Sequence, residues 1–312
     1  MNENKNEHLL QKTGIVLSGA LLCCALWGSA FPCIKIGYQL FHISPDDTSS
    51  QILFAGYRFT LAGILALIIG SILNKKLLLP KKESYGKIFK LSMLQTVLQY
   101  LFFYIGLANT TGVKASIIEG VNVFIAILVA SVVFRQESLT GKKMAGCTIG
   151  FLGVVLVNLT GNGLDLHFKL IGEGFIFLST IAYAFSSVYL KQYSKSENPV
   201  VLSGWQFVTG GAIMICYGFI SGGGILSWTV NGVAMLIYLA LVSAVAYSLW
   251  GILLKYNPIS KVAVFGFMNP VFGVILSGIL LNESDSIGMM SITALILVSV
   301  GIYIVYSEKN IS

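Results

Sequence analysis

Charged side chains are scarce in this chain of 312 residues, at 11% of the composition, while hydrophobic residues make up 55% and mean hydropathy is +0.82. A water-soluble domain of this length needs many more charges to cover its surface. The low charge content therefore excludes an ordinary soluble fold. It indicates an all-α protein that lies in a lipid bilayer, where helices satisfy their own backbone hydrogen bonds.

The residue types that carry enzyme chemistry are also few. The three histidines lie in the tail and in loops, without metal-ligand spacing, and no phosphate-binding loop of the Gly-x4-Gly-Lys-Ser/Thr type is present. The five cysteines all fall in apolar segments, and an odd number gives no disulfide framework. We therefore expect no enzyme activity, no metal, no cofactor and no ATP-driven step within this chain.

What the sequence does have is a series of long apolar runs. Charge-free stretches such as 13–34, 91–113 and 286–307 each exceed the ~20 residues that a helix needs to span hydrocarbon. We expect the first run to be a retained helix rather than a signal peptide, because it shows no small-residue cleavage site. The predicted spans are 14–39, 52–73, 88–107, 113–134, 143–160, 172–190, 200–220, 232–254, 261–281 and 286–306.

The cationic residues predict the orientation of these spans. Sixteen of the 20 lysines and arginines fall on one side of the predicted topology, and only Lys114 and Lys169 fall on the other. The positive-inside rule then places the first side, with both termini, in the cytoplasm of a multi-pass plasma-membrane protein. The net charge of +7 is explained by this topology and by lipid contact, so we expect no nucleic-acid partner.

The spans form two similar sets of five, over residues 14–160 and 172–306. Gly56-Tyr57-Arg58-Phe59 aligns with Gly204-Trp205-Gln206-Phe207, and Tyr100 and Asn122 align with Tyr247 and Asn269. Because five is odd, the second set must enter the bilayer from the opposite side. Two inverted repeats are typical of secondary transporters, with the binding site between the repeats near the membrane midplane.

The chain resembles the drug/metabolite transporter superfamily, and specifically its EamA-type members. The motifs that carry the resemblance are Trp27-Gly28-Ser29-Ala30-Phe31 with Lys35, Tyr57-Arg58-Phe59, Asn269-Pro270, Gln136-Glu137 and Asn282-Glu283. The resemblance implies ten helices in two inverted five-helix repeats and alternating-access transport of small polar or amphiphilic metabolites. It also makes proton-coupled export of amino acids or related metabolites the leading expectation.

Three charged residues lie inside predicted spans, namely Lys35, Arg58 and Glu119. Each is costly in hydrocarbon, by ~2.5–3.5 kcal/mol on insertion scales, and so needs a partner or water. The guanidinium of Arg58 either pairs with Glu119 or grips an anionic group of the substrate. Glu119 is a candidate for proton coupling. The alternative is that Glu119 stays permanently ionised and pairs with Arg58. Lys35 is expected to extend toward the outer interface rather than bind substrate.

Polar and aromatic residues of several spans predict a mixed pocket of the kind that binds small molecules, although each alone also suits an interhelical hydrogen bond. Gly28 with Pro32, and Gly266 with Pro270, predict kinks that line the pathway or are simply filled by packing. Glu137-Ser138 and Glu283-Ser284 are expected to cap the helices that follow. The candidate pocket residues are Trp27, Lys35, Arg58, Gln95, Gln99, Tyr100, Asn122, Gln206, Tyr247, Trp250 and Asn269.

Other readings stay open at this point. An uncoupled facilitator or exchanger has the same sequence features, and a membrane-embedded enzyme or lipid-handling protein is the alternative from another class. The glycine stripe of Gly146, Gly150 and Gly153 allows close helix contact either inside a monomer or in a homodimer.

Overall fold

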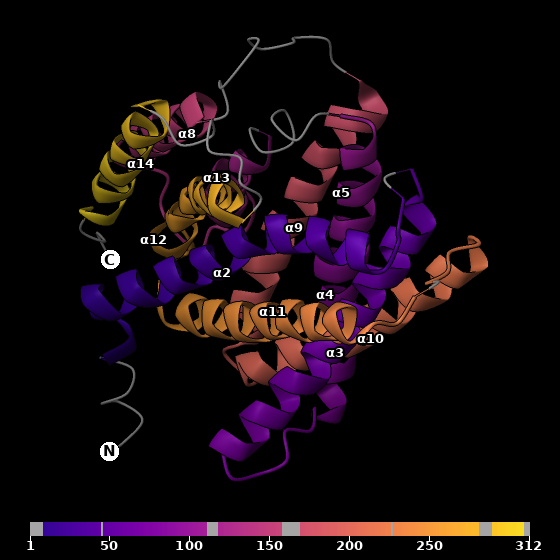
Figure 1. Cartoon of the computed structure of the whole chain (residues 1–312). Helices are drawn as coiled ribbons and strands as arrows, with labels where there is room; N and C mark the ends of the chain where they lie inside the picture. Colours follow the sequence, from indigo (N-terminus) through magenta and orange to yellow (C-terminus); the bar gives the residue numbers. More distant parts are fainter. Residues whose placement is uncertain are drawn as a thin grey trace.

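The structure is a computed structural model, and it describes residues 9–44, 46–110, 118–157, 169–225, 227–280 and 289–308. Within those ranges every regular element is a helix (Figure 1). The elements are α2 (Thr13–Leu40), α3 (Thr48–Leu73), η1 (Lys82–Ser84), α4 (Tyr85–Leu91), η2 (Ser92–Leu98), α5 (Gln99–Ala108), α7 (Asn122–Leu128), η3 (Val129–Val133), α8 (Gly141–Val157), η4 (Leu170–Gly174), α9 (Phe175–Tyr193), α10 (Pro199–Ile220), α11 (Val230–Tyr256), α12 (Ile259–Ala263), η5 (Val264–Phe267), α13 (Met268–Leu280) and α14 (Met289–Tyr306).

Six helical segments of the described ranges are long and apolar enough to cross a bilayer. They agree with predicted spans 1–3 and 6–8 to within six residues at each end. The other four predicted spans hold shorter described helices, each bordering residues outside the described ranges, so a crossing by these four stays a prediction. The six long segments are Thr13–Leu40, Thr48–Leu73, Lys82–Leu107, Leu170–Tyr193, Pro199–Ile220 and Val230–Tyr256.

Helix contacts follow a reciprocal pattern. α3 packs along α10, and α8 packs along α14. α2 lies beside α11 (Figure 1) and also contacts α13, while α9 contacts α5 and α7. If the two halves are exchanged as the sequence alignment directs, α2 takes the place of α9, α11 that of α5 and α13 that of α7. The contacts of α2 with α11 and α13 then map onto those of α9 with α5 and α7, and the α3–α10 and α8–α14 contacts map onto themselves, which is the pattern that a two-fold axis would produce.

The contact between α3 and α10 depends on four glycines. A Cβ on Gly63 would stand 2.5 Å from the carbonyl oxygen of Gly204, and one on Gly211 would stand 2.9 Å from the carbonyl oxygen of Gly56. Gly56 aligns with Gly204 and Gly63 with Gly211, so the two contacts are reciprocal. Absence of side chains lets the backbones approach closely, as is common between helices in membranes.

The ends of α5 and α11 share one capping interaction. The amide of Asn109 donates to the carbonyl of Ile105 at 2.8 Å, and that of Asn257 donates to the carbonyl of Leu253 at 3.0 Å. The Asn109 side chain thus supplies a donor to a carbonyl of the last helical turn, and the Asn257 side chain adds a second donor to a carbonyl that also accepts the Asn257 N–H. The two residues stand at matching positions of the aligned halves, so local chemistry repeats as well as packing.

The two predicted proline sites differ in local structure. α2 continues as a single α-helix through Pro32, and a Cβ on Gly28 would stand only 2.5 Å from the Cβ of Phe272 on α13. In the second half, the α-helix tightens to a 3-10 helix over Val264–Phe267, directly before Pro270. The close contact at Gly28 brings the two proline-containing segments together.

Candidate functional site

Arg58 lies in the interior of the helical body, at 2% exposure. Its Nε donates to the carbonyl of Leu239 at 3.3 Å, and Nη2 donates to the Ser243 hydroxyl at 3.0 Å. The guanidinium also stands 5.2 Å from the centre of the Phe59 ring. Nη1 is buried without a hydrogen-bond partner in the described part of the chain. α3 and α11 therefore hold the cation in a fixed position with one donor group free.

A layer of aromatic rings extends from Phe59, the ring next to Arg58. The Trp27 ring meets Tyr247 and Trp250 edge-on, with centroids 5.1 and 5.0 Å apart. The hydroxyls of Tyr100 and Tyr247 share a hydrogen bond of 2.8 Å, and the Phe59 ring lies 4.4 Å from Tyr100. Such a layer offers apolar area and ring faces beside the polar tips of tyrosine and tryptophan.

Two glutamines join α10 to the π-helix η2 within this interior. The Gln206 amide donates to Gln95 Oε1 at 2.6 Å. Oε1 of Gln206 and Oε1 of Gln99 are buried without partners among the described residues. π-turns occur often at functional sites in helices, and this one carries Gln95. The interior thus holds unsatisfied acceptors as well as the free donors of Arg58 and of the Trp27 ring nitrogen.

Arg58 is a buried cation whose electrostatic neighbours among the described residues include the Tyr104 hydroxyl. Within the described ranges, the one ion pair joins Lys143 and Glu137, so no described carboxylate neutralises Arg58. A buried charge is stable only if another charge or several hydrogen bonds compensate it. The arrangement suits an anionic group placed against Nη1, with an apolar or aromatic remainder against the rings. No cluster of metal-ligating side chains occurs in the described ranges.

Some predicted site residues lie elsewhere. Glu119 is partly buried and has no partner among described residues, so the predicted pair with Arg58 does not form in this structure. Lys35 is exposed on α2. Asn122 and Asn269 are half-buried, and the Oδ1 of Asn122 lies 3.8 Å from the Cβ position of Gly266. Asn122 thus lies at the contact between α7 and η5.

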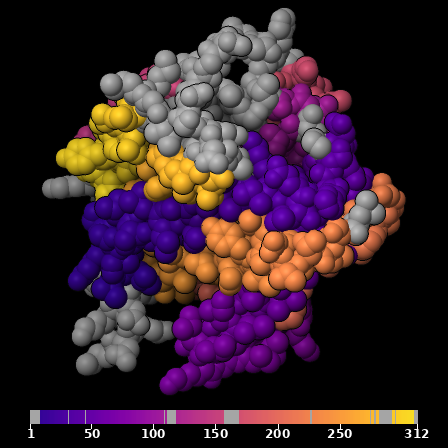
Figure 2. Space-filling view, viewed as in Figure 1, coloured from indigo at the N-terminus to yellow at the C-terminus, as the bar shows by residue number. Residues whose placement is uncertain are grey.

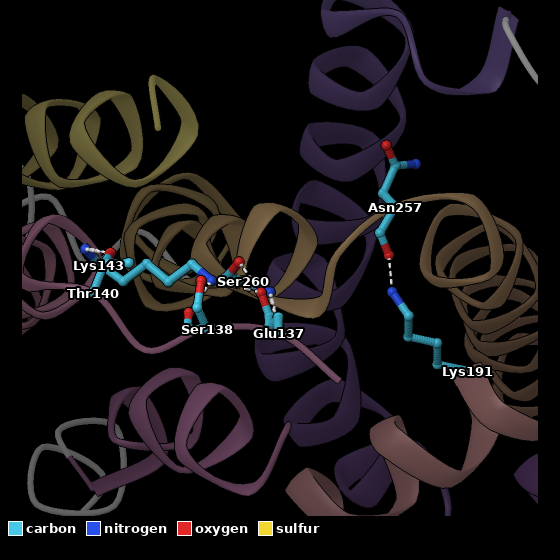
Figure 3. A network of polar contacts seen from close by, with 7 residues as sticks. All are labelled: Glu137, Ser138, Thr140, Lys143, Lys191, Asn257 and Ser260. Carbon is cyan, nitrogen blue, oxygen red and sulfur yellow. Dashed lines mark hydrogen bonds and ion pairs between the residues drawn. The ribbon is translucent and has the colours of Figure 1, made fainter. Parts of the chain in front are cut away.

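A second polar network joins the connection that precedes α8 to the start of α12 (Figure 3). Glu137 Oε1 accepts the Ser260 N–H at 3.0 Å, and Oε2 accepts a hydrogen bond from the Ser260 hydroxyl and an ion pair of 2.9 Å from Lys143. Lys191 donates to the carbonyl of Asn257 on the same connection. The amide of Asn257 also donates to the carbonyl of Leu10 at 3.1 Å.

This network corrects one expectation. Glu137 and Ser138 were expected to cap the helix that follows them, but the side chain that meets the first turn of α8 is Thr140, whose hydroxyl accepts the Lys143 N–H at 3.3 Å. Glu137 instead accepts from the first turn of α12, 123 residues away in the chain. A carboxylate suits any helix N-terminus, and the sequence does not say which helix it will reach. The matching Glu283 lies outside the described residues.

Several residues of the interior escaped sequence reasoning. Ser243 and the carbonyl of Leu239 hold Arg58, yet neither carries a chemical signal in the sequence. Phe59 and Phe207 stack with centroids 5.3 Å apart. Both phenylalanines stand in the alignment of the two halves, but neither was predicted as a site residue, although their aligned positions were the available signal.

A multi-helix membrane protein with a buried polar and aromatic interior is the class that this fold defines. The model of the EamA-like transporter family matches residues 14–159 and again residues 170–307. The chain belongs to the EamA-like transporter family, and it is a transporter rather than an enzyme.

The relatives extend over nearly the whole chain. An uncharacterised transporter of Archaeoglobus fulgidus is 28% identical over 301 residues, covering 96% of this chain and 100% of the relative. A protein of Escherichia coli K12 named "Probable amino-acid metabolite efflux pump" is 28% identical over 312 residues, covering 94% of each chain. A solved crystal structure superposes with a TM-score of 0.76 at 14% identity, covering 94% of this chain and 96% of its own. That similarity supports the fold alone.

Proposed function

We propose that this protein is a secondary transporter that exports small metabolites with a carboxylate group, amino acids or their derivatives among them, across the plasma membrane. The observation that carries the proposal is the free Nη1 of buried Arg58 beside an aromatic layer. A carboxylate there would supply the missing counter-charge through a charge-assisted hydrogen bond. The efflux-pump name of the Escherichia coli relative supports the same substrate class.

The mechanism we propose is alternating access between two inverted five-helix repeats with both termini in the cytoplasm. The reciprocal contacts of α3 with α10, and of α2 and α9 with their neighbours, support a two-fold relation between the halves. The two family matches also divide the chain at the same place. In this scheme the two halves rotate against each other at the glycine contact between α3 and α10. The backbones touch there without interlocking side chains, so the helices can change their angle.

The Glu137 network is proposed as the closure at the cytoplasmic end. Glu137 precedes α8 in the first half, and Ser260 begins the α12–α13 segment in the second half. Their hydrogen bonds therefore join the two halves at a connection that the charge distribution assigns to the cytoplasm. Opening toward the cytoplasm requires these hydrogen bonds to break.

Coupling to protons is assigned to Glu119. Its carboxyl has no ion-pair partner among described residues, so the side chain is free to gain and lose a proton as its surroundings change. A carboxyl in an apolar environment resists ionisation, which is the property that a proton carrier needs. The alternative is an uncoupled facilitator or exchanger, in which this carboxyl takes no part.

The test is transport in proteoliposomes with a panel of amino acids, decarboxylated analogues and lipids, with and without a proton gradient. We expect accumulation of carboxylate substrates that depends on the gradient, and loss of that dependence in Glu119→Gln. Gradient-independent exchange in the wild type would favour the facilitator. Equal transport of carboxylates and their decarboxylated analogues would remove the role of Arg58, and movement of lipids alone would place the protein in the lipid-handling class.

A further inference from the structure

The connection between α3 and α4, residues 74–84, is held to the body of the protein at two buried side chains, Leu78 in its middle and Ser84 at its end, where the Ser84 hydroxyl donates to Glu197 at 2.6 Å. Leu78 is 4% exposed. Its N–H donates to the Ser71 hydroxyl at 3.0 Å, and its carbonyl accepts from the Trp205 ring nitrogen at 3.1 Å. The Leu78 side chain also packs on Gly70, with Cδ1 2.7 Å from where a Cβ would stand. The path of this connection is therefore fixed.

Because Leu78 points inward, its neighbours are held outward. Leu77 is 73% exposed and Leu79 is 60% exposed. Ile72 and Leu73, in the last turn of α3, are exposed as well. The surface is therefore apolar at a point where the chain has already left the α3 helix, and where the rigid backbone gives the leucines no route to the interior.

Four lysines flank these leucines. Lys75 and Lys76 precede them, Lys81 and Lys82 follow them, and all four are exposed. Glu83 is the one acidic residue in 74–84. Figure 2 shows the end of α3, in violet, projecting at the lower edge of the molecule. The projecting tip thus presents leucines between two pairs of cations.

A partner for this tip must be both anionic and apolar. Phosphates alone match the lysines but leave the leucines in water, which is unfavourable. The boundary between headgroups and acyl chains of an anionic leaflet offers both surfaces at once, and polybasic segments next to spans are attracted to it. The connection also stands where a membrane-spanning helix ends, so the leaflet is already beside it.

We propose that residues 72–82 form an anionic-lipid docking surface, with Leu77 and Leu79 in the acyl boundary and the four lysines on lipid phosphates. Lipid bound there steadies the end of α3 through Leu78, and through Trp205 it steadies α10. The α3–α10 pair carries Arg58, so lipid composition reaches the site through these two helices. The proposal does not depend on which substrate the protein carries.

The experiment measures lipids retained by the purified full chain after delipidation, by native mass spectrometry, from equal mixtures of phosphatidylglycerol and phosphatidylcholine. We expect the wild type to keep phosphatidylglycerol in preference, and the K75Q/K76Q/K81Q/K82Q variant to lose about tenfold in retention. K12Q/K142Q/K169Q/K195Q removes the same net charge at exposed lysines elsewhere and should retain phosphatidylglycerol as the wild type does.

A leucine variant separates lipid from a soluble acidic partner. L77N/L79N keeps every charge, and docking into a leaflet predicts that it too loses phosphatidylglycerol, with the salt dependence of the remainder unchanged. Full retention in L77N/L79N would overturn insertion and point to purely electrostatic attraction. Equal retention of the two lipids by the wild type, or an equal loss in the lysine control, would overturn the docking surface. Melting temperatures in detergent show whether each variant is folded.

Discussion

Tyr100 and Tyr247 share a hydrogen bond of 2.8 Å between their hydroxyl oxygens, and they are 147 residues apart at matching positions of the two aligned halves. If the proposed two-fold relation between the halves holds, residues that touch their own aligned partners lie beside its axis. The stacked pair of Phe59 and Phe207 behaves in the same way. Arg58 directly precedes Phe59, yet the residue aligned with Arg58 is Gln206, so only one of the two aligned positions carries a cation.

The single cation leads to a prediction about Arg58→Lys. Lysine keeps the charge but loses the planar fork that donates to Leu239, to Ser243 and to a bound carboxylate. Loss of a hydrogen bond to a charged group costs about 1.5–3 kcal/mol, so apparent affinity for a carboxylate substrate should fall at least about tenfold. Transport at varied substrate concentration measures this.

The matched control is Arg135→Lys, which changes the other arginine of the chain, an exposed residue outside the interior. It should transport as the wild type does. Unchanged affinity in Arg58→Lys would show that the guanidinium is a structural fixture and not a substrate contact.

The close contact between α3 and α10 predicts that Gly211→Ala lowers the stability of the protein. A Cβ at this position would stand 2.5 Å from the Thr60 backbone nitrogen and 2.9 Å from the Gly56 carbonyl oxygen, so the helices must move apart. Overpacking of this kind costs about 1–3 kcal/mol. The melting temperature should fall, whereas Gly14→Ala, with open space around it, should leave it unchanged or raise it. A melting temperature equal to that of the wild type in Gly211→Ala would show that α3 and α10 can move apart without loss of stability.

The Glu137 network predicts a local effect of Ser260→Ala. The variant loses the hydroxyl bond to Glu137 but keeps the Ser260 N–H bond, so the α12 segment should hold less firmly to the connection before α8. Hydrogen exchange at Ile259–Ala263 should speed up several-fold, because the net worth of one such bond is about 1 kcal/mol. Ser138→Ala removes a hydroxyl close by but keeps the carbonyl that Lys143 uses, and it should exchange as the wild type does. Identical exchange in both variants would remove the proposed closure.

Glu197 predicts a dependence of stability on pH. Burial opposes its ionisation, but hydrogen bonds from the Ser84 hydroxyl and the Asn198 N–H outweigh burial, and the pKa of the carboxyl is lowered from its ordinary value of 4.5. A lowered native pKa contributes stability above pH 4.5 that is lost as the pH falls through the native value. Glu197→Gln should therefore show a flatter melting temperature across the acid range.

The comparison for that experiment is Glu83→Gln, which removes an exposed charge from the same side of the molecule. It should keep the acid dependence of the wild type. If Glu197→Gln keeps the dependence as well, the hydrogen bond from Ser84 does not favour the ionised carboxyl.

Helix positions were predicted well because hydropathy is a property of local sequence. Predicted span 1, residues 14–39, compares with Thr13–Leu40, and predicted span 7, residues 200–220, compares with Pro199–Ile220. The π-turns at 92–98 and 170–174 were not predicted, because nothing in their composition differs from an α-helix. The inward position of Arg58 was expected from the cost of exposing it to lipid.

The partners of the site residues were not predictable in the same way. Arg58 was expected to pair with Glu119 or to bind substrate. The pair with Glu119 does not form, and the guanidinium donates to Ser243 and to the Leu239 carbonyl, 185 and 181 residues away, while the contact with substrate stays a prediction. Glu137 was expected to act on its own helix, but it reaches Ser260. Such pairings depend on how two helices are rotated and staggered against each other, and a single apolar helix allows many such arrangements.

The sequence by itself determined that the chain is helical and apolar and, to within six residues, where its six long helices begin and end. The matching of one half with the other stays a prediction. Tertiary structure decided which polar groups meet in the interior and which donor of Arg58 is left free. The physical reason is that hydrophobicity and helix formation act over neighbouring residues. Hydrogen bonds between helices instead require atoms far apart in the chain to come within about 3 Å.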